Sequence, residues 1–484
     1  MSLKQKTLRG LSWSFIDNFV AQAVSFIVGI VLARLVSPAE FGILGYITFF
    51  VAISASLVDS GFGSALIRKK DCTTTDCSTV FYFNLTVSFF LYVLLFFGSP
   101  KIESFFNVPG LALILRVAGL VLIINALGNI QLTLLIKHID FKTKTKISVS
   151  SDTLAGIIAI ILAYKGFGVW SLVCRSLLGQ FFTSVLLWFF SNWRPSMIFS
   201  IKSFKELFGF GYKLALSGLI DTIFKYIYYP IIGKYFTPTT LGHYTRSQQF
   251  VGPFSSILTM NIQRVSFPVL STIQDDPEKL KMGFRKIMKS TMLITFALML
   301  GLAAIAKPLI LILIGEEWLP CVPYLQLMCL SYMLYPLHAM NLNAITVKGR
   351  SDLFLKLEII KKIMYIPLIL IGIYLGVFAL LIGDIVISFI AYFLNSYFSA
   401  RLIRYSTRAQ IMDVLPLLLV SLCVSALVWC ITFLGWNQWA TIILQLAAGT
   451  VLTVGAYEMM RQSNYLEIKQ IVLQAIRKIN IFKK

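Results

Sequence analysis

Four basic side chains lie within segments of this sequence that are predicted to cross a membrane: Arg175, Lys225, Arg246 and Arg264. A charge in such a stretch is costly in lipid, so it is expected to face a cavity or a polar partner. A cationic cavity favours an anionic substrate, because phosphate and carboxylate groups lose water on entry and need replacement charge. These four residues are therefore the candidate binding residues for a phosphate or an acidic sugar.

Acidic and amide side chains in similar stretches are expected to line the same cavity. Asp221 and Lys225 lie about one helical turn apart, so a pair that neutralises itself is an alternative interpretation of those two. For each residue alone, a structural ion pair or a side chain that reaches the membrane interface is the other alternative. The set comprises Asp17, Asn18, Asp59, Asp221, Gln248, Gln249 and Asn261.

The sequence shows no constellation typical of an enzyme, a metal site or a nucleotide site. The 3 histidines, His138, His243 and His338, have no metal-ligand spacing, and no glycine pattern completes a phosphate-binding loop. The 7 cysteines are odd in number and scattered, so we interpret them, Cys72 and Cys77 included, as small buried hydrophobic residues. We therefore expect no catalytic residue, no metal and no cofactor.

The composition indicates that lipid surrounds most of the chain. Of its 484 residues, 57% are hydrophobic and 13% charged, and the mean hydropathy is +0.81. Soluble proteins carry about 25% charged residues. The net charge of +22 would suggest a nucleic-acid partner in a soluble protein. Here it is explained by cytoplasmic loops, which collect Lys and Arg, so we expect membrane lipids and no nucleic acid as partners.

The apolar segments predict about fourteen membrane-spanning helices, since roughly 20 residues cross the hydrocarbon. Basic residues concentrate in every second loop, which places both termini in the cytoplasm. Segment 245–271 is polar, but removing it would invert every later loop, so we keep it as a span that faces protein or water. The predicted spans are 11–34, 41–64, 79–98, 111–136, 147–164, 168–190, 208–233, 245–271, 290–314, 321–346, 359–376, 377–400, 413–434 and 439–459.

A weak internal repeat relates the two halves. With an offset of about 200 residues, Leu32–Tyr46 aligns with Ile232–Arg246, so that Pro38 meets Pro238 and Gly42 meets Gly242. Chance similarity of two turns is the alternative, because Pro and Gly are ordinary in loops. The even number of intervening spans predicts two lobes of equal orientation, related by an axis along the membrane normal.

The predicted fold is an all-α polytopic membrane protein with two six-helix lobes in a parallel pseudo-repeat, followed by two C-terminal helices. The divisions are 1–200 for the N-terminal lobe, 201–406 for the C-terminal lobe, 407–460 for the last two spans and 461–484 for a cytoplasmic amphipathic tail. A second amphipathic segment, 198–208, joins the lobes, and both are expected to lie on the anionic leaflet.

Three segments resemble the polysaccharide transporters called Wzx-type flippases, within the multidrug/oligosaccharidyl-lipid/polysaccharide (MOP) exporter superfamily. They are Leu8–Gly42, Tyr235–Phe250 and Phe267–Lys286, and the likeness, closest to the subgroup of the colanic-acid exporter, extends over essentially the whole chain. It implies flipping of undecaprenyl-pyrophosphate-linked oligosaccharide across the bacterial inner membrane by alternating access, beside glycan polymerase or export machinery. Asp17 resembles in placement an acidic residue that couples cations in some members, with H⁺ or Na⁺ as the candidate ion.

Two other functions are alternatives. A cation-coupled multidrug antiporter of the same superfamily would need an anionic or apolar cavity, and the basic residues between 175 and 264 count against it. A membrane glycan polymerase or ligase usually needs a large external loop that carries Arg or His, and the predicted outer loops are short. Transport without enzymatic chemistry is therefore the expected function.

Overall fold

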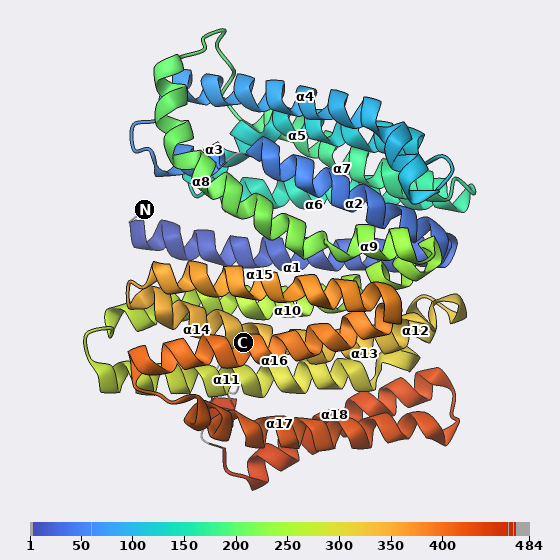
Figure 1. Ribbon diagram of the computed structural model, residues 1–484, viewed down its shortest axis with the longest axis vertical. Coiled ribbons are helices and arrows are strands. Elements are labelled where there is room, and N and C mark those ends of the chain that lie inside the picture. Colours follow the sequence, from blue (N-terminus) through green and yellow to red (C-terminus); the bar gives the residue numbers. More distant parts are fainter. Residues whose placement is uncertain (1–2, 60, 463, 468, 471–484) are drawn as a thin grey trace, which may run out of the picture. The chain divides into compact units, whose positions relative to one another are not determined.

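The computed structural model describes residues 3–59, 61–462, 464–467 and 469–470, without the side chains of residues 3–12, 14–18, 261 and 265. In these ranges all regular secondary structure is helical, which confirms the predicted all-α class (Figure 1). The predicted tail at 461–484 lies largely outside the described residues.

The chain divides into two compact units, Met1–Thr245 and Arg246–Lys484, with the boundary inside α10. The first unit contains α1 (Leu3–Leu35), α2 (Pro38–Asp59), α3 (Phe62–Arg68), α4 (Thr74–Phe106), α5 (Leu111–Lys137), α6 (Phe141–Tyr164), α7 (Val169–Phe190), α8 (Ile201–Tyr226), α9 (Tyr228–Tyr235) and the start of α10 (Pro238–Thr272). The second contains α11 (Pro277–Ala304), α12 (Ala306–Leu313), α13 (Cys321–Tyr332), α14 (Tyr335–Val347), α15 (Ser351–Leu375), α16 (Val377–Ile403), α17 (Thr407–Cys430) and α18 (Gln438–Met459), with 3-10 turns at Glu316–Trp318 and Ile431–Leu434.

Ten stretches of the described chain are long and apolar enough to cross a membrane, from Pro38–Arg68 to Gln438–Met459. The protein is therefore a multi-pass membrane protein. Each predicted span falls on a helix or on a helix with a break in it. Four predicted spans are not among these ten, so the number fourteen remains a prediction. The span at 11–34 is represented only by a shorter apolar helix, Phe19–Leu35, and those at 245–271, 321–346 and 359–376 lie on helices that are polar, broken or charged.

The two copies of the repeat begin their helices in the same way. Ser37 precedes Pro38 and accepts a hydrogen bond from the Glu40 amide at 3.4 Å, which caps α2. Thr237 precedes Pro238 and accepts one from the Thr240 amide at 3.1 Å, which caps α10. A hydroxyl cap followed by Pro suits a helix start, because the first amides have no partner within the helix and Pro lacks an amide hydrogen.

The starts of α2 and α10 also contact each other reciprocally within the first unit. A Cβ atom on Gly42 would collide with the carbonyl oxygen of Pro238, and one on Gly242 would collide with that of Pro38. Beside this contact the Tyr46 hydroxyl donates to the Gly233 carbonyl at 2.7 Å. Glycine is required at both positions because only a residue without Cβ lets the two backbones approach this closely.

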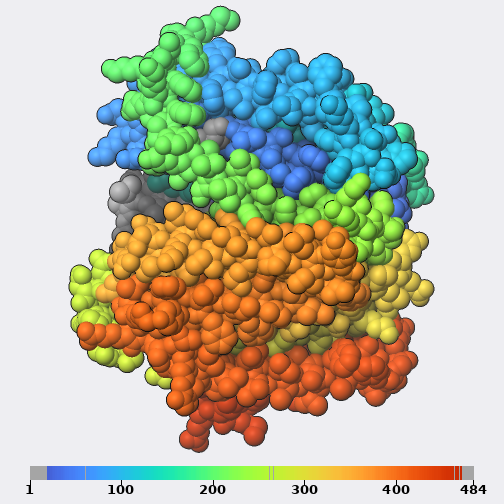
Figure 2. Space-filling view, in the orientation of Figure 1, coloured from blue at the N-terminus to red at the C-terminus, as the bar shows by residue number. Residues whose placement is uncertain are grey.

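The core at one end of the first unit changes the interpretation of segment 198–208. Phe62 and Leu66 of α3, both fully buried, form a hydrophobic cluster with Leu207 of α8, and Phe204 packs against the same cluster. Phe204, Leu207 and Phe208 of this segment, which was expected to lie on the leaflet, therefore contact protein. Figure 2 shows the green α8 lying on the surface of the first unit.

In the second unit, α17 packs against α11 and is tied to it by charge. The Arg285 guanidinium of α11 donates two hydrogen bonds to the Asp413 carboxylate of α17, each at 2.6 Å. The paired geometry matches the two carboxylate oxygens, which makes such contacts stronger than single ones. Asp413 thus fixes the start of the last two spans, which lie outside both copies of the repeat.

Candidate functional site

Arg175 lies among the helices of the first unit. It is half-buried on α7 and donates to the backbone carbonyl of Ser25 in α1 at 3.3 Å. The charge of Asp152 on α6 also acts on it. A guanidinium with a carbonyl and a carboxylate nearby is already partly satisfied, so this residue joins three helices as well as being a candidate for substrate binding.

Asp221 and Lys225 both lie exposed on α8. The Lys225 ammonium is 5.2 Å from the ring centroid of Tyr226, within the range of a cation–π contact. An exposed cation on a helix that is apolar enough to span a membrane needs water or an anionic group beside it. The role of Lys225 as a candidate for the anionic part of a substrate stays a prediction.

Asp59 marks a break in the second predicted span. It is exposed as the last residue of α2, next to the turn at Gly61, whose φ of 69° lies in the left-handed region. Its carboxylate accepts a hydrogen bond from Asn129 of α5. Thr133, one turn further along α5, also lies close to the start of α3. The break thus gathers a carboxylate, an amide and a hydroxyl, which suits a polar ligand or a cation.

Arg246, at the start of the second unit, is only 3% exposed. Its guanidinium donates to Gln249 at 2.8 Å and lies 5.0 Å from the ring centroid of Phe250. One turn of α10 thus brings two predicted site residues together. Gln248 points to another helix and donates to the Tyr332 hydroxyl of α13 at 3.4 Å.

Arg264 is exposed on the same helix, five turns further on. A rise of about 1.5 Å per residue puts it roughly 27 Å from Arg246 along the helix axis. The two arginines therefore cannot hold a single phosphate group, and a substrate that touched both would have to be extended. The side chains of Asp17, Asn18 and Asn261 lie outside the described residues.

A buried carboxylate in the second unit was missing from the predicted site. Asp384 of α16 is 7% exposed and accepts a hydrogen bond from the Ser331 hydroxyl of α13 at 2.5 Å. Its other oxygen accepts one from the Tyr365 hydroxyl of α15 at 2.9 Å. Within the described part of the chain, no lysine or arginine forms an ion pair with it. Its position in the apolar stretch 377–400 was the signal that could have singled it out.

Polar side chains continue from Asp384 along the same face of α16. The Ser388 hydroxyl donates to the Ser331 carbonyl at 3.2 Å and lies 3.1 Å from His338 Nε2. The Asn395 amide lies 3.4 Å from His338 Nδ1 on the other side of that ring. These hydrogen bonds join α13, α14 and α16 into one polar network beside the carboxylate.

This arrangement can hold a small cation or a proton but lacks the donors of a transition-metal site. The described residues contain no cluster of three or more His, Cys, Asp or Glu side chains with metal-binding geometry. A carboxylate surrounded by hydroxyl groups inside a membrane protein is typical of proton relays and ion pathways. We name Asp384, Ser331 and Tyr365 the carboxylate site.

A family model described as "Polysaccharide biosynthesis protein" matches residues 31–323 of the chain. An uncharacterized membrane protein in the cps region of Klebsiella pneumoniae is 29% identical over 376 residues, which cover 76% of this chain and 77% of the relative. The lipopolysaccharide biosynthesis protein WzxC of Escherichia coli (strain K12) is 25% identical over 378 residues, 77% of this chain and 76% of the relative.

Among solved structures, the lipid II flippase MurJ in an inward closed conformation has a similar fold. The alignment covers 94% of this chain and 100% of that chain, with a TM-score of 0.72 at 14% identity. The resemblance to polysaccharide transporters stated from the sequence is thus confirmed by family, relatives and fold. Because the family model matches more than half of its residues, the chain belongs to the family of polysaccharide biosynthesis proteins.

Proposed function

We propose that this protein flips lipid-linked oligosaccharide repeat units across the bacterial inner membrane, as a step of polysaccharide export. The substrate would be an oligosaccharide on undecaprenyl pyrophosphate, moved from the cytoplasmic to the periplasmic leaflet by alternating access. Family membership supports a role in polysaccharide biosynthesis. The fold shared with a structure titled lipid II flippase supports movement of a lipid-linked sugar.

The observation that carries the proposal is the exposure of two cations on predicted spans. Lys225 of α8 and Arg264 of α10 both present their charges outside the packed interior. Cations at such positions can replace the water that a pyrophosphate loses on leaving the leaflet surface. Arg175 and Arg246 are more deeply packed, and in this proposal they shape and polarise the path rather than bind first.

The carboxylate site supplies a candidate for coupling. In our proposal Asp384 takes up a proton or Na⁺ in one conformation and releases it in the other, while Ser331 and Tyr365 hold its two oxygens. Asp59, with Asn129, is the corresponding candidate in the first unit. Asp17 remains a candidate on the basis of the resemblance alone.

The topology proposed with this function has both termini in the cytoplasm and lobes at 1–200 and 201–406. Spans 13 and 14 follow at 407–460, and the cytoplasmic tail occupies 461–484. The two compact units divide inside α10 rather than at residue 200, because α8 packs against α2 and α3, and α9 packs against α2. A glycan polymerase or export machinery is the proposed protein partner.

Reconstitution provides the direct test. Purified protein in liposomes would be given a fluorescent polyprenyl-pyrophosphate oligosaccharide, and arrival in the opposite leaflet would be measured by a membrane-impermeant quencher. Faster arrival than in protein-free liposomes supports flipping. Transport of cationic dyes without movement of the lipid would identify a multidrug antiporter instead, and growth of the glycan chain would identify a polymerase or ligase.

A deletion strain tests the same function in cells. Without the protein, and without a redundant flippase, lipid-linked repeat units should accumulate on the cytoplasmic leaflet. Normal polysaccharide export in that strain would contradict the proposal.

A further inference from the structure

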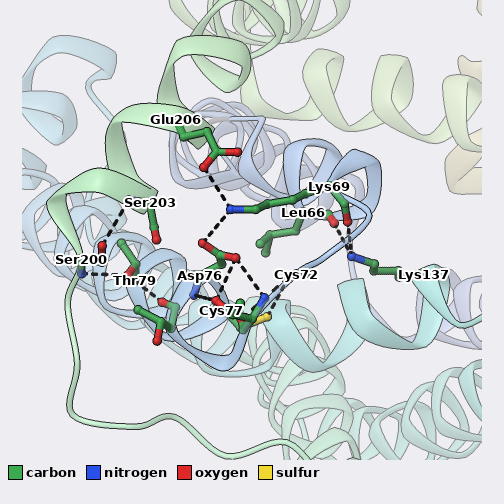
Figure 3. Close-up of polar contacts among 12 residues, drawn as sticks. Leu66, Lys69, Cys72, Asp76, Cys77, Thr79, Lys137, Ser200, Ser203 and Glu206 are labelled. Carbon is green, nitrogen blue, oxygen red and sulfur yellow. Dashed lines mark hydrogen bonds and ion pairs between the residues drawn. The ribbon is translucent and has the colours of Figure 1, made fainter.

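The turn between α3 and α4 brings two cysteine side chains into contact. The Sγ atoms of Cys72 and Cys77 lie 3.4 Å apart (Figure 3). Thr73 and Asp76 form a capping box, in which each side chain accepts a hydrogen bond from the backbone amide of the other. Cys72 precedes the cap and Cys77 is the fourth residue of the helix, the two positions whose side chains pack together beside such a box. The cap therefore sets the distance between the sulfur atoms.

Positive charges lie close to this pair. The Lys69 ammonium is 3.1 Å from Asp76 and 3.0 Å from Glu206 of α8. Burial lowers the pKa of Lys69, but the hydrogen bonds to Glu206 and Asp76 outweigh it and raise the pKa, so the lysine stays charged. Lys137 of α5 donates to the carbonyls of Leu66 and Lys69 at 2.9 and 2.6 Å, which holds its ammonium beside the same turn.

These surroundings make Cys72 the more reactive thiol. The hydrogen bond with Cys77 is the largest cause that lowers the pKa of Cys72 to about 7, and the charge of Lys137 contributes, against the opposing effects of burial and Asp76. Cys72 is half-buried in the turn, whereas Cys77 is 2% exposed. The thiolate is the nucleophilic form of cysteine. Cys72, the more accessible of the two, is therefore placed to attack an oxidant, and Cys77 beside it is placed to resolve the product as a disulfide.

We propose that Cys72 and Cys77 form a redox-active dithiol, a modification site on the face that the charge pattern assigns to the cytoplasm. Its reactants are peroxides and trivalent arsenicals. In a reducing compartment the pair stays as two thiols, and a disulfide forms only on exposure to an oxidant. This replaces the interpretation of both residues as inert hydrophobic packing.

With peroxide the reaction balances in two steps. The Cys72 thiolate attacks one peroxide oxygen, so that an S–O bond forms, the O–O bond breaks, and hydroxide leaves and is protonated to water. The Cys77 sulfur then attacks the Cys72 sulfenic acid, an S–S bond replaces the S–O bond, and a second water leaves with the Cys77 proton. Two thiols and one hydrogen peroxide thus give one disulfide and two waters, and the sulfur atoms move from 3.4 Å to about 2.05 Å.

The site lies where α4 holds the connection into α8. The Ser196 amide donates to the Ser78 hydroxyl at 3.0 Å, and the Ser200 amide donates to Thr79 at 3.0 Å. Together with the Lys69–Glu206 ion pair, these contacts hold the start of α8 and the residues before it against the turn and the first residues of α4. Figure 3 shows the ion pair and the hydrogen bond between Ser200 and Thr79. A disulfide would close the turn to which these contacts hold α8.

Peptide mapping of the full-length protein provides the test. Membranes are treated with hydrogen peroxide, remaining thiols are blocked with N-ethylmaleimide, and chymotryptic peptides are analysed by mass spectrometry. We expect the peptide that carries both cysteines to lose two hydrogen atoms and to escape alkylation, and dithiothreitol to reverse this. Full alkylation of both residues after peroxide, or oxidation of Cys72 to sulfinic acid without a disulfide, would overturn the proposal.

Phenylarsine oxide gives a second readout that needs no oxidation. The arsenic forms bonds to two thiols, and its oxygen leaves as water, so it protects only close pairs. We expect it to protect Cys72 from maleimide in the native protein but not in Cys77→Ser, while labelling of the exposed Cys423 is unchanged in both. Equal protection of Cys72 in the variant, or none in the native protein, would show that the two sulfurs do not act together.

Discussion

Gly42 of α2 and Pro238 of α10 are in backbone contact, and Gly242 and Pro38 repeat that contact in reverse. A two-fold axis between the two turns would produce such a reciprocal contact, in which the glycine of each turn meets the proline of the other. The sequence repeat is therefore a structural repeat at these positions. Under the proposed topology the contact lies at the outer ends of two spans.

Gly42→Ala should destabilise the protein by about 1–3 kcal/mol, the usual cost of inserting atoms into a filled space. The added methyl would meet a carbonyl oxygen that cannot move without moving the start of α10. The measurement is the thermal unfolding midpoint of the purified protein in detergent.

Gly98→Ala is the matched control for that change. Gly98 lies within α4 of the same unit, and no atom outside its own helix lies within 4 Å of the position that an added methyl group would take. Ala is better than Gly inside a helix by about 1 kcal/mol, so the control should hold or raise the midpoint. Equal midpoints for the two variants would mean that the contact at Gly42 is not tight.

Asp384→Asn should abolish the response of transport to an imposed H⁺ or Na⁺ gradient, because an amide carries neither the charge nor the ionisable proton of a carboxyl group. Reconstituted flipping is measured with and without each gradient. Tyr365→Phe should retain the response with reduced rate, since Ser331 still donates to the carboxylate.

Asp352→Asn controls for the loss of a carboxylate elsewhere on the second unit. Asp352 lies exposed beside Arg350, whose hydrogen bond is the largest cause that lowers the pKa of Asp352 to about 2. Its replacement should leave coupling unchanged. A normal gradient response in Asp384→Asn would remove the carboxylate site from the coupling mechanism.

Replacing Lys225 and Arg264 together by Gln should reduce flipping at least tenfold without lowering the amount of protein in the membrane. A hydrogen bond to a charged group contributes about 1.5–3 kcal/mol, so two such losses exceed one factor of ten. The readouts are the flipping rate and the membrane abundance of each variant.

The control for the double variant replaces Lys101 and Lys165, two exposed lysines of the first unit, by Gln. This change removes the same total charge, so a general effect of net charge on transport would appear in both. Unchanged flipping in the Lys225 and Arg264 variant would exclude those residues from the substrate site.

The alkylation rate of Cys72 should rise with pH around a midpoint near 7, because only the thiolate reacts and the pKa of this thiol is lowered to about 7. Below the midpoint the thiol is protonated and slow. Cys77→Ala removes the hydrogen bond that is the main cause, so the midpoint should move upward towards the ordinary thiol value.

The measurement is the initial rate of maleimide labelling from about pH 6 to about pH 9, a range that includes the ordinary thiol pKa. Peptide mapping assigns the labelling to Cys72. Cys423→Ala, which removes an exposed cysteine of α17, should leave the midpoint unchanged. An unshifted midpoint in Cys77→Ala would show that Lys137 and Lys69 set the acidity without help from the second thiol.

The helices and the starts of the two repeat copies could be predicted from local sequence alone. These features depend on residues near one another in the chain, such as Ser37 beside Pro38 and Thr237 beside Pro238. The family resemblance likewise needed only local similarity. Hydropathy also identified polar positions such as Arg175 and Lys225 as unusual, but it could not say which of them have partners.

The partners of these polar side chains depend on how the helices pack. Asp384 meets Ser331 across 53 residues of sequence, and Lys69 meets Glu206 across 137. Such pairs depend on how helices pack, and a helix can turn its polar face to many neighbours without changing its own pattern. The same reason separates Cys72 and Cys77 from the other cysteines, since the cap and the charges of α5 and α8, not the spacing alone, give that pair its chemistry.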